Sequence, residues 1–186
     1  IIANRNLHRF DISFQSRLWH TVPGLVRTFS SAEGYCFQDR VPGVVASGKI
    51  KSGKIGRRAI AHPLEVAEEA SIPPAIDATA RKFGRIDALV NCAGITGRTN
   101  VPGHEVDLAD FDLVYRVNLR GAFLLSKAVL PHMLARKYGR VLHVASIAGK
   151  EGNAGMTAYS ATKAGLIGMV KSLAKDYVEQ GITINA

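Results

Sequence analysis

The feature that most constrains this chain is the stretch between Gly139 and Lys171. A near-continuous apolar run over residues 141–145 leads to Ser146, a Gly-rich loop follows, and a helical pattern then carries Tyr159 and Lys163. Such a run is typical of a strand that is covered on both faces of a parallel sheet. Ligands bind beyond the carboxyl ends of such strands, and residues four apart share one face of a helix. We therefore expect these three side chains to meet at one end of a parallel sheet.

The three residue types suit proton exchange with a carbonyl group. A phenol ionises near pH 10, so it transfers protons poorly at neutral pH unless its phenolate is stabilised. The ammonium group of Lys163 lies one helical turn from Tyr159 and would favour that phenolate. A serine hydroxyl at Ser146 would hold the carbonyl oxygen, which completes a set of groups able to interconvert a carbonyl and an alcohol. The alternative is an exposed Tyr–Lys pair that only supports the helix, because this spacing also arises by chance.

Further motifs accompany these residues, and the whole set resembles the short-chain dehydrogenase/reductase family, in particular its 3-oxoacyl-carrier-protein-reductase-like members. The matching motifs are Asn91-Cys92-Ala93-Gly94, Val117-Asn118-Leu119-Arg120-Gly121, Ser146 and Tyr159-Ser160-Ala161-Thr162-Lys163. The resemblance covers about residues 64–186 and implies an α/β fold, a Rossmann-like doubly wound parallel sheet. We expect that fold to be incomplete here, with one βα unit near residue 61 and the C-terminal lobe missing.

The resemblance also implies catalytic roles. Tyr159 would donate and accept the proton, Ser146 would orient the carbonyl, and Lys163 would bind the nicotinamide ribose. Asn118 would anchor a water molecule in the proton relay. From the residues alone, Asn118 also fits a core asparagine whose amide is hydrogen-bonded within the protein.

The expected cofactor is NADP or NAD, with NADP slightly favoured, and it would be lined by Asn91, Ala93, Gly94 and Lys163. From the residues alone, the first three also fit a turn that merely ends a strand. The phosphate-binding turn is irregular: the family pattern is Gly-x-x-x-Gly-x-Gly, whereas the glycines here are Gly48, Gly53 and Gly56. The short apolar run at residues 44–46 would be the first strand. No acidic residue occupies the place that normally reads the adenosine ribose.

The expected function is therefore that of an NAD(P)-dependent oxidoreductase acting on a small carbonyl or acyl-thioester substrate. A 3-oxoacyl thioester is the leading substrate, and a sugar or polyol is the alternative within the enzyme class. A non-catalytic truncated relative is the alternative outside it. The resemblance also implies a homo-oligomer, with the helices near residues 107–137 and 157–179 at the subunit interface.

Periodicity predicts the other elements. A helix is expected over Ile72–Phe83, because prolines occupy its first turn and a glycine follows its last residue. Strands are expected at residues 86–90 and 182–185. In the long helical stretch, the residues expected on the buried side are Phe111, Val114, Tyr115, Leu119, Phe123, Leu124 and Ala128. His143 is expected to be structural.

Charge and composition separate residues 1–39, a basic N-terminal extension, from a partial dehydrogenase domain at residues 40–186. The net charge is +9, and ten Lys or Arg against three acids lie in the first 60 residues. The basic character therefore does not belong to the enzyme-like part, and we expect no nucleic-acid partner. Residues 1–32 are rich in Arg and Ser and poor in acids, which is typical of a mitochondrial targeting segment, although a disordered basic tail also fits.

The cysteine count and the apolar runs limit the remaining classes. Two cysteines make neither a disulfide framework nor a metal cluster, so no metal site is expected. No apolar run approaches membrane-spanning length. We expect a cytoplasmic or mitochondrial-matrix protein that is neither secreted nor inserted in a membrane.

Overall fold

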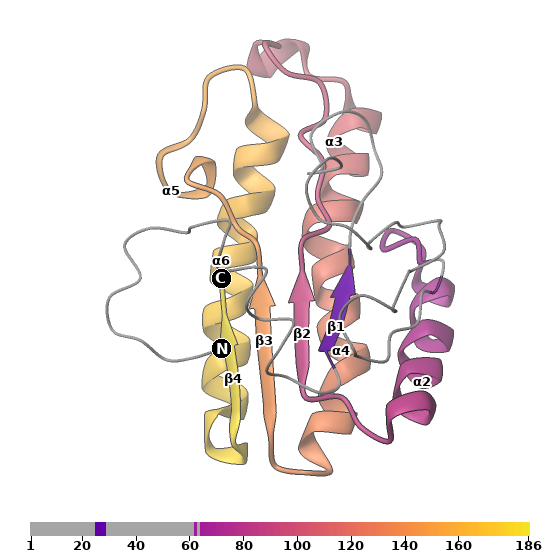
Figure 1. Ribbon diagram of the computed structural model, residues 1–186. Coiled ribbons are helices and arrows are strands. Elements are labelled where there is room, and N and C mark those ends of the chain that lie inside the picture. Colours follow the sequence, from indigo (N-terminus) through magenta and orange to yellow (C-terminus); the bar gives the residue numbers. More distant parts are fainter. Residues whose placement is uncertain (1–24, 29–61, 63) are drawn as a thin grey trace, which may run out of the picture.

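The computed structural model describes residues 25–28, 62 and 64–186, which form a parallel sheet with helices packed against it (Figure 1). The strands pair in chain order, and every pairing is parallel. They are β1 (Leu25–Thr28), β2 (Ala88–Asn91), β3 (Gly139–His143) and β4 (Ile182–Asn185). This architecture confirms the α/β class and the parallel sheet that the sequence predicts.

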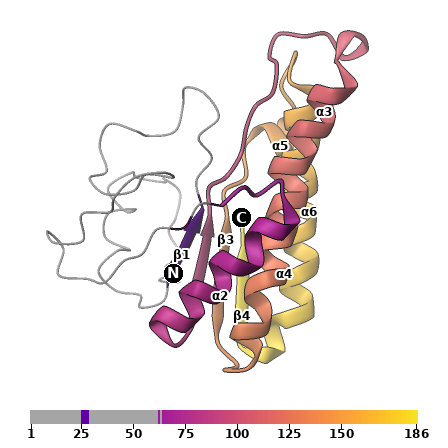
Figure 2. The same ribbon diagram turned by 90° about the vertical axis from the view of Figure 1, so that its right-hand side faces the viewer.

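Helices α4 and α6 cover one face of the sheet, and α2 packs beside α4 (Figures 1 and 2). The α-helices are α2 (Ile72–Phe83), α3 (Leu108–Tyr115), α4 (Gly121–Leu134), α5 (Ala148–Glu151) and α6 (Thr157–Tyr177). Short 3-10 turns are η2 (Glu69–Ser71), η3 (Gly103–Glu105) and η5 (Val178–Gln180). Consecutive parallel strands joined by right-handed crossovers place their helices on the same face, as observed for this part of the chain.

Helix α2 has the bounds that the sequence predicts. Pro73 lies in its first turn, where the missing N–H costs nothing. Gly84 follows its last residue with φ +76, and the Gly84 N–H donates to the carbonyl of Ala80. A glycine reaches this left-handed conformation without steric cost, so it ends the helix and turns the chain towards β2.

The long helical stretch expected near residues 107–137 is divided by a π-helical turn, η4 (Arg116–Arg120), between α3 and α4. Asp107 caps its start, because its Oδ1 accepts from the backbone N of Ala109 at 2.7 Å. Helix α4 ends at Leu134, earlier than expected, and Lys137 follows with φ +51. A π turn inserts one residue into the helical repeat and often marks a functional site.

The buried side of this helical stretch differs in part from the expected one. Val114 and Leu124 lie in the core, as expected. Tyr115 and Phe123 are 42% and 44% exposed, so their expected burial was wrong. The buried positions of the stretch are instead centred on Val117, Ala122 and Leu125, which places Tyr115 and Phe123 on the outer side.

The core lies between the sheet and this helix layer. Its fully buried side chains include Leu89 from β2, Val141 from β3 and Ile182 from β4, packed against Leu125 and Val129 of α4. Along β3 and β4, buried residues alternate with more exposed ones. One side of β3 and of β4 is therefore much more deeply buried than the other.

Two strand predictions needed correction. Strand β3 ends at His143, so Ser146 lies three residues beyond the strand rather than at its last position. Strand β1 comes from residues 25–28, inside the segment expected to precede the domain, and it pairs in register with β2. The candidate first strand at residues 44–46 and the glycines Gly48, Gly53 and Gly56 lie outside the described residues. Local propensity could not find β1, because its pairing partner lies about 60 residues away.

Candidate active site

Lys163 is the centre of the polar cluster beyond the carboxyl end of β3. Its side chain is buried, with the residue only 4% exposed. Its Nζ donates a hydrogen bond of 2.6 Å to the backbone carbonyl of Val144, and it lies 5.6 Å from the ring centroid of Tyr159. The helical spacing thus brings Tyr159 and Lys163 together as the sequence predicts, and the backbone just past β3 holds the ammonium group in place.

The environment of Lys163 is unusual for a cation. Burial lowers its pKa from 10.5 to about 8, and an electrostatic interaction with Cys92 acts in the opposite, raising direction. With a pKa of about 8, the amine is still mainly protonated at neutral pH. The site therefore contains a buried positive charge that a ligand or a phenolate would stabilise.

Asn118 in η4 is fully engaged with backbone and side-chain partners. Its Oδ1 accepts from the N–H of Ile95 at 2.8 Å, and its Nδ2 donates to the carbonyl of Ile95 at 2.9 Å. The second amide hydrogen goes to Thr162 Oγ1 at 3.2 Å. Both amide hydrogens are therefore used, whereas Oδ1 retains one lone pair. This geometry fits a core asparagine and also leaves one acceptor position for a water molecule.

Thr162 is a linking residue that the sequence analysis did not single out. It is buried beside Lys163, and its hydroxyl accepts from Asn118 and donates to the backbone carbonyl of Tyr159 at 2.9 Å. The chain Asn118–Thr162–Tyr159 thus fastens η4 to the first turn of α6. Its position three residues after Tyr159 was the available signal, because a threonine hydroxyl commonly bonds a carbonyl of the preceding turn.

Ser146 lies in the loop between β3 and α5 and is half-buried. Its Oγ accepts from the backbone N of Ala148 at 3.2 Å. Among the described residues, no hydrogen bond joins Ser146 to Tyr159, and the hydroxyl hydrogen of Ser146 has no acceptor. The serine is thus positioned by its own loop and keeps its donor available.

The turn after β2 lies against the same cluster. Asn91 and Ala93 are buried. An added Cβ on Gly94 would lie 3.4 Å from Oδ1 of Asn118 and 3.5 Å from Nζ of Lys163. Gly94 has no positive φ, so its role is to leave space beside the lysine rather than to permit the turn. Gly97 is the conformationally special glycine of this loop, with φ +66.

His143 connects this turn to the helix layer. Its Nδ1 lies 3.1 Å from Nδ2 of Asn91, and its Nε2 lies 2.9 Å from Oγ of Ser126 on α4. Burial, with a smaller contribution from the charge of Lys163, lowers the pKa of His143 from 6.5 to about 4. The ring is therefore neutral at physiological pH. This agrees with the expected structural role, although its two partners were not foreseen.

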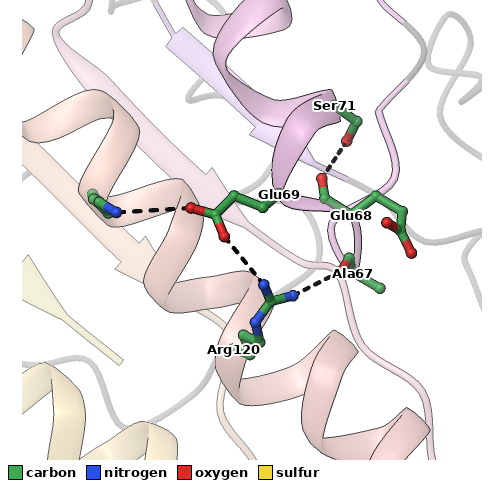
Figure 3. A network of polar contacts seen from close by, with 6 residues as sticks. Ala67, Glu68, Glu69, Ser71 and Arg120 are labelled. Atoms are coloured by element: carbon green, nitrogen blue, oxygen red, sulfur yellow. Dashed lines mark hydrogen bonds and ion pairs between the residues drawn. The ribbon is translucent and has the colours of Figure 1, made fainter.

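A second polar network fastens the segment before α2 to the π turn (Figure 3). Arg120, two residues after Asn118, donates to the carbonyl of Ala67 at 3.0 Å and to Oε2 of Glu69 at 3.2 Å. Lys127 of α4 lies 3.8 Å from the other carboxylate oxygen of Glu69. These contacts are largely exposed, so each contributes little stability alone. Together they hold residues 67–69 against the element that carries Asn118.

The residues present fit a dinucleotide at its nicotinamide-ribose end. Lys163 has three N–H donors, and Val144 takes one of them. The others have no hydrogen-bond acceptor among the described residues, and Gly94 places no side chain beside them. Ribose hydroxyls are suitable acceptors for such donors. The glycines proposed for the phosphate end lie outside the described part of the chain.

The described residues contain neither a candidate metal centre nor a membrane-spanning helix. No group of three or more His, Cys, Asp or Glu side chains there is arranged to hold a metal ion. None of the helices described has both the length and the apolar character needed to cross a membrane.

Comparisons with known proteins agree with this geometry. A family model described as short chain dehydrogenase matches residues 35–186. The 2-dehydro-3-deoxy-L-rhamnonate dehydrogenase (NAD(+)) of Sphingomonas sp. strain SKA58 is 44% identical over 123 residues, which are 66% of this chain and 49% of that protein. The 3-oxoacyl-[acyl-carrier-protein] reductase of Synechocystis sp. is 44% identical over 131 residues, 70% of this chain and 52% of that protein.

Solved structures of proteins with bound NAD+ or NADP have a similar fold. A NAD+-bound xylitol dehydrogenase superposes with a TM-score of 0.66 and 34% identity, covering 68% of this chain and 48% of that one. The structure described as ElxO with NADP bound has a TM-score of 0.66 and 32% identity, covering 68% of this chain and 51% of that one. The chain spans about half the length of the curated relatives that it matches. Its sequence motifs, its parallel sheet and a family match over most of its length show that it belongs to the short-chain dehydrogenase family.

Proposed function

We propose that this chain carries the proton-transfer residues of an NAD(P)-dependent oxidoreductase that interconverts a carbonyl and a secondary alcohol. The observation that carries the proposal is the buried ammonium group of Lys163. It lies beside the Tyr159 ring and has donors left over for a ligand. A buried cation lowers the stability of the fold unless partners compensate its charge. Here one protein carbonyl is its hydrogen-bond partner.

Each side chain has a defined task in this proposal. In the direction of reduction, the Tyr159 hydroxyl transfers its proton to the carbonyl oxygen, and the Lys163 charge stabilises the phenolate that remains. The free O–H of Ser146 donates to the same oxygen and orients it. Asn118 uses its remaining lone pair to hold a water molecule through which the proton is replaced. A bound nicotinamide dinucleotide supplies or accepts the hydride.

Lys163 and the turn of Asn91, Ala93 and Gly94 would hold the dinucleotide. The proposed cofactor is NADP or NAD, with NADP slightly favoured. The relatives support both, since one name specifies NAD(+) and the solved structures include NAD+-bound and NADP-bound proteins. The phosphate-binding role of Gly48, Gly53 and Gly56 remains a proposal.

The leading substrate is a 3-oxoacyl thioester, supported by several relatives named 3-oxoacyl-[acyl-carrier-protein] reductase at 39% to 44% identity. A sugar or polyol is the second candidate. It is supported by the rhamnonate dehydrogenase among the relatives and by the xylitol dehydrogenase among the solved structures.

The test combines binding and turnover. Titration calorimetry of the purified chain with NADH and NADPH is expected to show binding of at least one dinucleotide. Acetoacetyl-CoA or xylulose is then supplied, and loss of the reduced nicotinamide absorbance is followed. Tyr159→Phe is expected to lower kcat by about 10²- to 10⁴-fold, because it removes the general acid, and to leave the dissociation constant within about twofold.

The matched control is Tyr138→Phe, which removes the same hydroxyl from an exposed tyrosine outside the site; it should leave both quantities unchanged. A folded wild-type chain that binds neither dinucleotide would contradict the enzyme proposal. That outcome would favour the alternative of a non-catalytic relative.

We also propose that the chain assembles with copies of itself through α3, α4 and α6. The exposed aromatic side chains of Tyr115 in α3 and Phe123 in α4 support this, because they are large apolar groups available for contact with another copy. The double variant Tyr115→Glu/Phe123→Glu is expected to reduce the molar mass measured by light scattering to one half or one quarter of the wild-type value, without a change in helix content. An unchanged assembly in the double variant, or a monomeric wild type, would contradict this surface as the interface.

For the N-terminal third, we propose a basic extension over residues 1–39, with residues 25–28 contributing a strand to the sheet. The compartment is the cytoplasm or the mitochondrial matrix, and the Arg- and Ser-rich composition supports the second of these. Fusion of residues 1–39 to a fluorescent protein would decide between them.

A further inference from the structure

The buried network around His143 has a direction that can be read from its hydrogen bonds. Ser126 Oγ lies 3.0 Å from the carbonyl of Ala122, one turn earlier in α4, and donates its single hydrogen there. The same oxygen must then accept from His143 Nε2, which lies 2.9 Å away. The neutral ring therefore carries its proton on Nε2, and Nδ1 is left as an acceptor.

That acceptor determines how the Asn91 amide is oriented. Asn91 lies opposite His143 in the β2–β3 register, and its Nδ2 is 3.1 Å from Nδ1 of the ring. With Nδ2 turned to the histidine, Oδ1 faces the turn and accepts from the backbone N–H of Ala93 at 3.1 Å. Reversing the amide would place an N–H against the N–H of Ala93. Ser126, His143, Asn91 and the Ala93 N–H thus form one continuous series of hydrogen bonds from α4 to the turn after β2.

We propose that His143 is a positioning residue, which orients the Asn91 amide through its unprotonated Nδ1 and thereby fixes the Asn91–Gly94 turn against which the dinucleotide lies. The part of this inference that concerns the dinucleotide rests on the proposed function. The part that concerns the turn rests on the hydrogen bonds alone. The helix-side contact to Ser126 selects the tautomer, and the strand-side contact to Asn91 does the positioning.

A matched pair of substitutions separates positioning from simple stabilisation. Asparagine places its amide oxygen near the position of Nδ1, whereas glutamine reaches the position of Nε2. His143→Asn therefore keeps an acceptor for Asn91 and loses the contact to Ser126, and His143→Gln does the reverse. Each variant loses one buried hydrogen bond, so both are expected to lower the unfolding midpoint to a similar degree.

Two readouts distinguish the variants. Hydrogen exchange of the Ala93 amide is expected to stay within about twofold of wild type in His143→Asn and to accelerate about tenfold in His143→Gln. The dissociation constant for NADPH or NADH is expected to follow the same pattern, within about twofold for Asn and weaker by about tenfold for Gln. In the wild type, nitrogen-15 spectra of the ring are expected to place the proton on Nε2.

The inference is overturned if the two variants change Ala93 exchange equally, because a purely structural role would affect both alike. It is also overturned if the wild-type ring carries its proton on Nδ1. If the folded wild type binds neither dinucleotide, the proposed function fails, and the Ala93 exchange and the ring spectra still decide the role of His143.

Discussion

Replacing Lys163 with methionine tests how strongly burial acts on the central charge of the site. The two side chains have similar length and volume, but methionine carries no charge. Lys163 is 4% exposed, so solvent screens its charge little. The variant therefore isolates the cost of keeping an ammonium group beneath the end of β3.

The magnitude follows from the shift in pKa. Burial lowers the pKa of Lys163 from 10.5 to about 8, and at 1.36 kcal/mol per unit this corresponds to about 3 kcal/mol. Because the folded pKa lies below the unfolded one, the unfolded chain binds more protons between these two pH values. Stability therefore rises with pH across that window. Below about pH 8 the full cost is present, and it is relieved as the pH approaches 10.5.

The assay is urea unfolding of wild type and Lys163→Met at several pH values from 7 to 10. The free energy of unfolding of the wild type minus that of the variant is expected to increase by about 2 to 3 kcal/mol between pH 7 and pH 10. Taking the difference between the proteins cancels the titration of those groups that do not interact with the charge of Lys163. Lys171→Met, on the exposed side of the same helix, is the control and should give curves parallel to those of the wild type.

Parallel curves for wild type and Lys163→Met would refute the reasoning, because they would mean that the folded and unfolded pKa values of Lys163 agree. A wild-type free energy of unfolding that falls relative to that of the variant as the pH rises would refute the reasoning more strongly. That result would require a raised pKa and hence a buried anion stabilising the ammonium group.

The remaining predictions concern stability around the site. Asn118→Leu leaves the partly buried N–H and C=O of Ile95 without their amide partner and is expected to cost about 2 to 4 kcal/mol in urea unfolding; a loss below about 0.5 kcal/mol would show that water replaces the amide. Gly97→Ala combines φ +66 with a Cβ only 2.5 Å from Cγ2 of Val114, so a loss of more than about 1 kcal/mol is expected. Gly168→Ala meets nothing within 4 Å and should instead raise the melting temperature, because alanine favours the helix; equal effects of the two alanines would contradict the steric argument.

Several features of the fold and the site could be predicted from the sequence because they depend on neighbours in the chain. The bounds of α2 follow from prolines at its start and a glycine after its end. Tyr159 and Lys163 lie together because the helical repeat places residues four apart on one face. The strand at Ile182–Asn185 follows from its alternating pattern of side chains. In each case, the deciding interactions are local.

Other features depended on segments that are distant in the chain. The position of β1 depends on pairing with β2, and the exposure of Tyr115 and Phe123 depends on which side of the helices packs against the rest of the fold. The strand ends at His143 rather than at Ser146, because the hydrogen bonds of the ladder, and not the apolar run, set its limit.

The site shows the same division. The sequence alone determined which side chains we propose for the chemistry, since the identities and spacing of Ser146, Tyr159 and Lys163 are local properties. Only the tertiary structure decided which distant groups are their partners in the site. The Val144 carbonyl accepts from the ammonium group of Lys163, and the amide of Asn118 binds the backbone of Ile95. The physical reason is that a buried polar group must find its partner wherever the packed chain supplies one, and a local pattern of residues carries no record of that distant partner.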